Sequence, residues 1–250
     1  MVGDFKDRTE AGQQLATAVL RLGLVQPLVL ALPRGGVPVG AEVARALHAP
    51  LDVLIVRKIG APGQPELAVA AMAEGDPGTV TVDERTSQAT EGDHAYIKRQ
   101  VRAQRSEIDR RCSTYRVGRA RLDVAGRTVV VVDDGVATGT TVRAALKALR
   151  RLAPAKIVLA VPVAAGDTVY ELSQLVDDIV CLSQPGDFRS VGTYYADFDQ
   201  VDDREVIALL DAAAARSEHE RGAPRSGPPT SVEPTAGESA AEPKGSWRRG

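Results

Sequence analysis

The chain has 250 residues, of which 44% are hydrophobic and 26% charged, and its formal net charge is −2. This composition is typical of a globular protein, and the near-zero charge excludes an overall basic field that would recruit nucleic acid. Cys112 and Cys181 are far apart in the sequence, which argues against a disulfide framework and a cysteine-based zinc site. The charged N-terminus lacks an apolar stretch, and no apolar run could span a bilayer, so we expect a cytoplasmic protein without a membrane partner.

Helices and strands are predicted to alternate along most of the chain. Apolar periodicity predicts helices over 9–22, 37–47, 91–115, 142–152, 167–175 and 203–214. Short apolar runs predict strands over 28–32, 51–56, 67–73, 79–82, 129–132, 156–163 and 179–182. This alternation predicts an α/β fold, in which helices flank a mostly parallel sheet and the ligand lies beyond the carboxyl ends of the strands.

The longest predicted helix, 91–115, has an apolar stripe on an otherwise charged surface. The stripe residues have nearly heptad spacing and are Ile97, Val101, Ile108, Cys112 and Tyr115. Such a stripe can face the core or form the seam of a homodimer. Nine arginines lie between positions 85 and 121, but acidic residues are interleaved with them. The pattern therefore favours a solvated helix face over an RNA-binding surface.

The C-terminal segment has a different composition from the rest of the chain. From Arg216 onward it consists mainly of Ser, Gly, Pro, Ala, Glu and Arg, with almost no large apolar residues. Such a segment cannot offset the entropy of ordering by burial. We therefore expect one folded domain over residues 1–215 and a disordered tail over 216–250.

The segment from Val129 to Thr141 is the most informative in the chain. Four valines predict a buried strand, and the adjacent carboxylates of Asp133 and Asp134 follow it directly. A turn of small and hydroxyl-bearing residues then leads into the next predicted helix. Free amides at a helix start bind phosphate well, and carboxylates accept hydrogen bonds from vicinal hydroxyls. The segment therefore predicts a site for a sugar phosphate.

Two common phosphate motifs do not fit this chain. A P-loop requires a lysine after its second glycine, and no lysine follows Gly139. The dinucleotide fingerprint requires Gly-x-Gly-x-x-Gly, a spacing that the glycines at 135 and 139, or at 35, 36 and 40, do not have.

Two further segments carry residues suited to anions. Residues 32–40 read Leu-Pro-Arg-Gly-Gly-Val-Pro-Val-Gly, so that glycines allow close backbone approach and Arg34 supplies donors for phosphate oxygens. Residues 56–66 begin with Arg57 and Lys58 after a predicted strand and are rich in glycine and proline. Because these basic residues and the acidic pair all follow predicted strands, we expect one site at one edge of the sheet.

The three segments resemble those of type I phosphoribosyltransferases, which use phosphoribosyl pyrophosphate (PRPP). All thirteen positions of 129–141 match the family's PRPP motif. The resemblance covers roughly residues 5–213, and within the family the chain resembles a group of uncharacterised bacterial proteins. The resemblance implies the type I fold, with a flexible loop after Lys58 and a small hood contributed mainly by 183–200. It also implies that Asp133 and Asp134 hold the ribose hydroxyls. The 5′-phosphate would be held by Ala137, Thr138, Gly139, Thr140 and Thr141.

The resemblance further implies how the reaction would proceed. Arg34, Gly35 and Lys58 would hold pyrophosphate, and the peptide bond between Arg34 and Gly35 would be cis. Lys58 would neutralise charge on the departing pyrophosphate while the loop excludes water from the ribose. Glu66, or alternatively Glu74, would relay a proton. Mg²⁺ would arrive with PRPP, held by the substrate's own oxygens with Asp133 acting through water, and no separate metal site is expected.

The acceptor base is indicated by two signals that conflict. Ala137 occupies a position where hypoxanthine-guanine enzymes carry an aspartate, which argues against a 6-oxopurine enzyme of that type. The segment 184–198 nevertheless resembles the hood of those enzymes, with Phe188 placed to stack on a purine and Asp197 placed to read its edge. The predicted function is transfer of phosphoribose from Mg-PRPP to a nitrogenous base, with a purine-like base favoured. The alternative is a non-catalytic protein that senses PRPP or a nucleotide.

Overall fold

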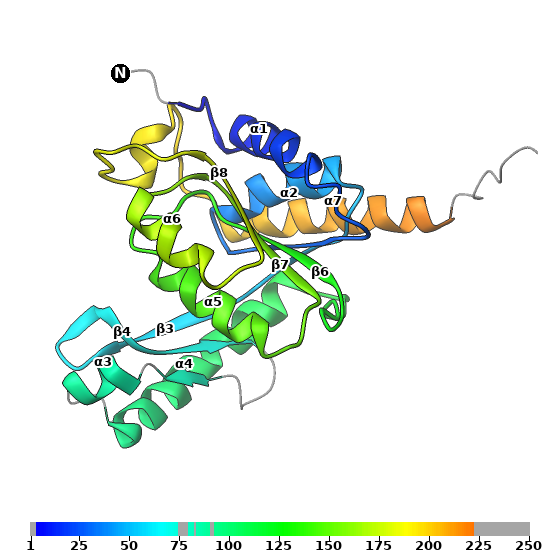
Figure 1. Ribbon diagram of the computed structural model, residues 1–250. Coiled ribbons are helices and arrows are strands. Elements are labelled where there is room, and N and C mark those ends of the chain that lie inside the picture. The colour runs from blue at the N-terminus through cyan, green and yellow to red at the C-terminus, as the bar shows by residue number, and fades with distance from the viewer. Residues whose placement is uncertain (1–3, 75–79, 83, 91–92, 223–250) are drawn as a thin grey trace, which may run out of the picture.

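The computed structural model describes residues 4–74, 80–82, 84–90 and 93–222 (Figure 1). Its helices are α1 (Arg8–Leu20), α2 (Gly36–Ala46), α3 (Glu84–Ala89), α4 (His94–Tyr115), α5 (Thr140–Arg150), α6 (Gly166–Ser173), α7 (Asp203–Gly222) and the short 3₁₀ helix η1 (Val191–Tyr194). Its strands are β1 (Leu28–Ala31), β2 (Leu51–Val53), β3 (Val56–Ala61), β4 (Gln64–Ala73), β5 (Val80–Val82), β6 (Thr128–Val132), β7 (Lys156–Val163) and β8 (Asp178–Ser183).

The main sheet has five parallel strands in the order β2-β1-β6-β7-β8. The predicted parallel sheet is thus confirmed. β1 and β6 are neighbours although about a hundred residues separate them, and Ala31 pairs with Val132 at their carboxyl ends. This register places the segments that follow the two strands side by side.

Alternate residues of the central strands point to opposite faces of the sheet, as the period of two requires. Val29, Val130 and their equivalents pack against α1, α2 and α7, whereas Leu30, Val131 and theirs pack against α5 and α6. Figure 1 shows these helices as layers on either side of the sheet. Burial on both faces explains why the strands read as continuous apolar runs rather than alternating ones.

A second, antiparallel sheet of β3, β4 and β5 forms an arm beside the main sheet, together with α3 and α4 (Figure 1). The predicted strand 51–56 is in fact divided, because β2 ends at Val53 and β3 begins at Val56. The segment after Lys58, which is expected to be a flexible loop, is a β-hairpin because β3 pairs antiparallel with β4. Its turn is at Pro62 and Gly63, and the positive φ of Gly63, 71°, is the conformation that glycine adopts freely.

Helix α4 covers the arm and its apolar stripe packs within the chain. Ile97, Ile108 and Tyr115 are at most 4% exposed, and they contact the arm and the main core. The stripe is thus used inside the protomer and does not remain as a seam for a second copy. Several of the helix's arginines pair with Glu107 or Asp109, which fits the solvated-face interpretation.

A buried ion network ties α4 to both sheets. Arg116 follows α4 and contacts Asp52 of β2 and Glu74 after β4, while it also donates to the Val53 carbonyl at 2.6 Å. These side chains are 9%, 8% and 2% exposed. The Cys112 thiol donates to Glu74 at 3.2 Å, and burial followed by the Glu74 charge raises the pKa of that thiol to about 12. The network therefore joins the arm to the main sheet.

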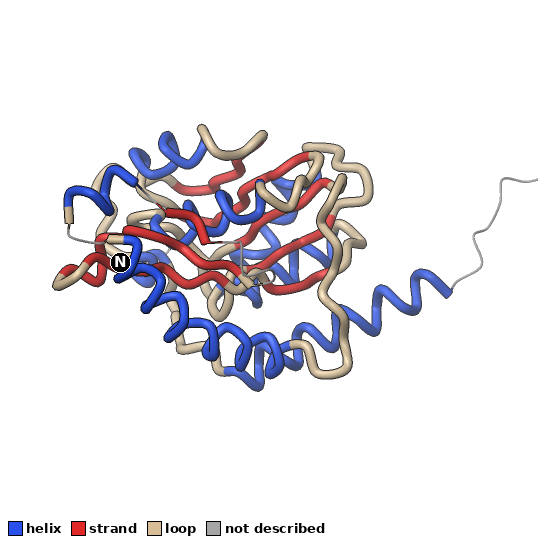
Figure 2. The backbone as a smooth tube through the Cα atoms, turned by 90° about the horizontal axis from the view of Figure 1, so that it is seen from below, coloured by secondary structure: helices blue, strands red, loops and turns tan. Residues whose placement is uncertain are grey.

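Helix α7 is longer than the sequence pattern indicates. It continues to Gly222, so residues 216–222 are helical where the tail was expected to begin, and the remainder of that tail lies outside the described residues. Figures 1 and 2 both show the end of α7 extending past the body of the molecule. Among the helices described, none has the length and apolar character needed to cross a bilayer.

Candidate active site

The acidic pair, Asp133 and Asp134, and the glycine turn, residues 33–36, lie against each other at the carboxyl ends of β6 and β1. The Leu32 amide donates to the Val132 carbonyl at 2.8 Å, which extends the pairing of the two strands into the turns. A Cβ atom on Gly35 would lie 1.9 Å from Oδ2 of Asp134, and one on Gly36 would lie 2.7 Å from the Val132 carbonyl oxygen. These positions have no room for a side chain. The glycines therefore allow the two turns to form one surface.

The basic residue of the glycine turn faces the start of α7. Arg34 lies 3.8 Å from Oδ1 of Asp203, which also accepts a 2.7 Å hydrogen bond from the buried Tyr115 hydroxyl. The cis peptide bond of this turn joins Pro33 to Arg34, so the expected position between Arg34 and Gly35 is wrong by one residue. The cis bond still lies beside the basic residue.

The two carboxyls are crowded and partly buried. The Asp134 amide donates to Oδ1 of Asp133 at 2.9 Å. Burial, followed by the charge of Asp134, holds the pKa of the Asp133 carboxyl well above its ordinary value. Burial also raises the pKa of Asp134, and Arg8 opposes that rise. The site thus favours cations and hydrogen-bond donors, including hydroxyls, next to these oxygens.

Arg8 is the site residue that the sequence reasoning missed. Its Nε donates to Oδ2 of Asp134 at 2.8 Å, and one terminal nitrogen donates to the Asp199 carbonyl at 2.7 Å. Its guanidinium carbon lies 3.8 Å from the centre of the Phe198 ring, a cation–π contact. Asp7 caps the helix and so fixes Arg8 in its first turn. The only signal in the sequence is the Asp-Arg pair near the N-terminus, to which no spacing rule assigns a role.

The turn expected to bind phosphate, residues 137–141, is called the phosphate turn, and it forms the N-terminus of helix α5. Gly139 has φ 67° and directly precedes α5, which begins two residues earlier than predicted, so that Thr140 and Thr141 lie in its first turn. The hydroxyls of Thr138 and Thr140 are 3.2 Å apart. Amides in the first turn have no partner within the helix, and the helix dipole is positive there. The structure thus brings the five predicted residues, 137–141, to one helix start.

The hood packs onto the acidic pair through Tyr195, whose hydroxyl donates to the Asp134 carbonyl at 2.5 Å. Phe188 stacks on Tyr194, with ring centres 5.4 Å apart. Asp197 is exposed, and its carboxylate accepts from the Asp199 amide at 3.2 Å. It is Phe198, through Arg8, that comes next to the acidic pair. The roles of Phe188 and Asp197 toward a base stay predictions.

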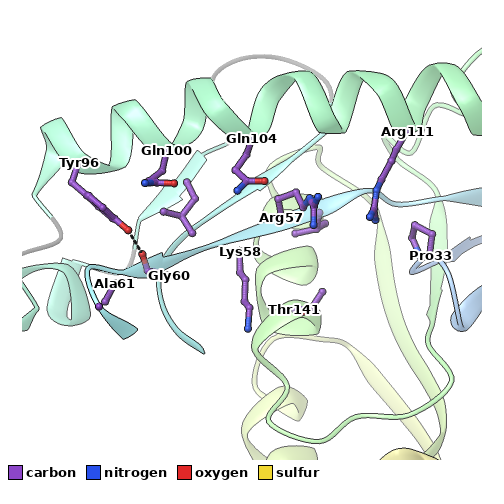
Figure 3. A pocket seen from close by; sticks show the side chains of 13 residues that line it. Pro33, Arg57, Lys58, Gly60, Ala61, Tyr96, Gln100, Gln104, Arg111 and Thr141 are labelled. Atoms are coloured by element: carbon purple, nitrogen blue, oxygen red, sulfur yellow. Dashed lines mark hydrogen bonds between the residues drawn. The ribbon is translucent and has the colours of Figure 1, made fainter. Parts of the chain in front are cut away.

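Lys58 lies on β3 and not in a loop, because the hairpin begins before it. It lines a cavity of about 570 Å³ together with Pro33 of the glycine turn and Thr141 of the phosphate turn. Figure 3 shows its side chain directed toward the start of α5. Glu66 lies on β4, but its side chain is outside the described part of the chain. Glu74 is buried against Arg116, and this pairing argues against a role as proton relay.

The described residues include no group of three or more His, Cys, Asp or Glu side chains placed to hold a metal ion. Carboxylate oxygens are ligands that Mg²⁺ accepts, and it usually keeps several waters and binds substrate phosphates as well. Asp134 is already paired with Arg8, so Asp133 would be the acid left to hold an incoming Mg²⁺ through water.

Residues 6–198 match the family described as "Phosphoribosyl transferase domain", so the chain belongs to that family. Two Mycobacterium tuberculosis proteins, "Putative phosphoribosyl transferase MT0597" (strain CDC 1551) and "Putative phosphoribosyl transferase Rv0571c" (strain H37Rv), are each 45% identical to it over 209 residues. The match covers 84% of this chain and 47% of each relative. The chain thus spans about half the length of these relatives.

The structure of TT1426 from Thermus thermophilus is 44% identical in sequence and superposes with a TM-score of 0.75. The match covers 84% of this chain and 98% of that protein. The type I phosphoribosyltransferase fold predicted from the three turns is confirmed.

Proposed function

We propose that the protein binds Mg-PRPP and transfers its phosphoribose to a nitrogenous base, with release of pyrophosphate. One observation carries the proposal: the acidic pair, the phosphate turn and the glycine turn meet at the carboxyl ends of two adjacent strands. Asp133 and Asp134 accept hydrogen bonds from the ribose hydroxyls, and residues 137–141 bind the 5′-phosphate. Mg²⁺ supplies charge neutralisation at the pyrophosphate oxygens when it is bound with the substrate.

Different residues stabilise the different charges that develop in the transfer step. The bond between C1 of the ribose and the pyrophosphate oxygen breaks, so positive charge grows on the ribose and negative charge on the leaving group. Lys58 and Arg34 stabilise the leaving group, whereas the nearby carboxylates stabilise the ribose. A ring nitrogen of the base forms the new bond from the opposite face, which inverts C1, and the proton of that nitrogen passes to a base such as Glu66.

We infer that the hood supplies the acceptor side. It packs on the acidic pair through Tyr195 and carries Asp197 and Phe188, an aromatic residue of the kind that stacks on a flat ring. This arrangement supports a purine-like acceptor.

The test is a screen of free bases with labelled PRPP and Mg²⁺, following pyrophosphate release. We expect release that depends on a purine-like base and falls at least about tenfold in Lys58→Met, since a charged contact contributes roughly 1.5–3 kcal/mol. Release with no dependence on any base would contradict transfer. Binding of PRPP without turnover of any base would support the non-catalytic sensor instead.

A further inference from the structure

The N-terminal segment of residues 5–8 lies against the hood and reaches the acidic pair. The Phe5 amide donates to the Tyr194 carbonyl at 3.0 Å, and the Phe5 carbonyl accepts from the Ala196 amide at 2.8 Å. Phe5 is 3% exposed, and its ring centre lies 5.4 Å from that of Tyr195. The hood is therefore paired with the start of the chain, and it also contacts Asp134 through the Tyr195 hydroxyl.

Arg8 connects this segment to a side chain of the acidic pair. Its Nε donates to Oδ2 of Asp134, and one terminal nitrogen donates to the Asp199 carbonyl of the hood. The guanidinium group also lies against the Phe198 ring. The side chains of Arg8 and Asp134 are 12% and 15% exposed, so both are largely shielded from water. These contacts fix the plane of the guanidinium group, whose donors have a rigid geometry.

The carboxylate of Asp134 is restrained by two neighbours. Oδ2 accepts from Arg8 at 2.8 Å, and Gly35 approaches so closely that an added Cβ atom would lie 1.9 Å from the same oxygen. A carboxylate held in this way keeps its orientation before a ligand arrives. Preorganisation of this kind increases affinity, because less conformational freedom is lost on binding.

The attachment of the hood does not depend on Arg8 alone. The backbone pairing of Phe5 and the hydrogen bond from the Tyr195 hydroxyl hold the hood in place as well. The contact of Arg8 with Asp134 differs from these, because it is made to the carboxylate to which the proposed function assigns a ribose hydroxyl. Loss of Arg8 should therefore change the binding site more than the fold.

We propose that Arg8 is a positioning residue for the ribose site, which orients the Asp134 carboxylate toward a ribose hydroxyl and joins that carboxylate to the hood. The inference rests on the proposed function, in which Asp134 accepts this hydrogen bond. Arg8 acts through Asp134 and needs no contact with the substrate. A planar guanidinium group can donate to Asp134 and Asp199 at once from two nitrogens in a fixed geometry, whereas the ammonium group of a lysine is a single point charge.

The test is a double-mutant cycle on the affinity for PRPP with Mg²⁺, measured by titration calorimetry. In metal sites, loss of a group that orients a liganding carboxylate weakens binding about 10- to 100-fold, and we expect Arg8→Gln to weaken PRPP binding about tenfold or more. In an Asp134→Ala background the same change should have little further effect, because no carboxylate remains to be oriented. Arg8→Lys keeps the charge without the planar fork, so its affinity should lie between those of Arg8→Gln and the unmodified protein.

Arg45→Gln is the matched control for these variants. Arg45 also pairs with a carboxylate, that of Glu42, but it lies in the last turn of α2 and is 54% exposed. We expect this variant to bind PRPP like the unmodified protein. Melting temperatures without ligand show whether each variant folds, and Arg8→Gln should melt close to the unmodified protein because the other hood contacts remain.

Unchanged PRPP affinity in Arg8→Gln, or in Arg8→Lys if the first variant does not fold, would overturn the proposal. Equal losses with and without the Asp134 carboxylate would overturn it too, because they would show that Arg8 only supports the fold. Tighter binding in Arg8→Gln would show that Arg8 competes with the substrate for Asp134, which is the opposite of the proposed role. Each of these results leaves the proposed function standing. Failure of the unmodified protein to bind Mg-PRPP would instead reject the proposed function and this inference together.

Discussion

Replacing Asp134 by asparagine should weaken the binding of PRPP about tenfold or more. The side chain keeps its shape but loses the negative charge with which we propose that it accepts a hydrogen bond from a ribose hydroxyl. Such charged hydrogen bonds contribute roughly 1.5–3 kcal/mol, or about 10- to 150-fold in affinity. Titration calorimetry on the variant and the unmodified protein measures this directly. Asp178→Asn is the matched control, because that carboxylate pairs with Lys156 at the opposite end of the sheet.

Folding should respond far less than binding to Asp134→Asn. Burial already raises the pKa of Asp134, so the charged form is costly in the folded protein despite the contact with Arg8. The asparagine carbonyl can still accept from Arg8, and Asp133 loses a like charge beside it. We expect a melting temperature without ligand close to that of the unmodified protein. A variant that melts much earlier yet binds PRPP normally would show that the carboxylate only supports the turn.

Replacing Arg116 by methionine should be the most destabilising single change in the molecule outside its apolar core. It leaves the carboxylates of Asp52 and Glu74 buried without their cation, and breaking a buried ion pair in this way costs about 3–5 kcal/mol. For a protein of this size we expect a melting temperature lower by roughly 6–20 °C. Thermal unfolding followed by circular dichroism measures the change.

Arg45→Met provides the comparison for Arg116→Met. Arg45 is also an arginine paired with a carboxylate, Glu42, but its side chain is 54% exposed. Surface pairs contribute about 0–1 kcal/mol, so this variant should melt within a few degrees of the unmodified protein. Similar melting temperatures for the two variants would show that the Arg116 network does not hold the arm to the sheet.

Most of the fold could be predicted because its signals are local. The strand 156–163 was predicted with the bounds that β7 has, and the valine run before Asp133 could only be a buried strand. The arm was predicted less well. The apolar stretch 51–56 looks like one strand, yet the chain changes sheets after Val53, and that change depends on pairing with β4 and on the Arg116 network rather than on any local pattern.

The site could be predicted where a single segment contains all of the functional groups concerned, as residues 133–141 do. It could not be predicted where the chemistry depends on contacts between distant segments. Arg8 contacts Asp134, which is 126 residues away in the sequence. The cavity between α4 and β3 is lined by Arg57 and Arg111, which come from these two different elements. The charge pattern of α4 correctly indicates a solvated face for most of its arginines. It does not reveal that Arg111 faces inward.

The most direct test of a PRPP site is the melting temperature of the unmodified protein with PRPP and Mg²⁺. At a concentration about 100 times its Kd, PRPP should stabilise the folded protein by about 2.7 kcal/mol. Ribose 5-phosphate should give a smaller shift, because it lacks the pyrophosphate, and free phosphate should give almost none. A melting temperature that saturating Mg-PRPP leaves unchanged would contradict the PRPP site, for a transferase and for a sensor alike.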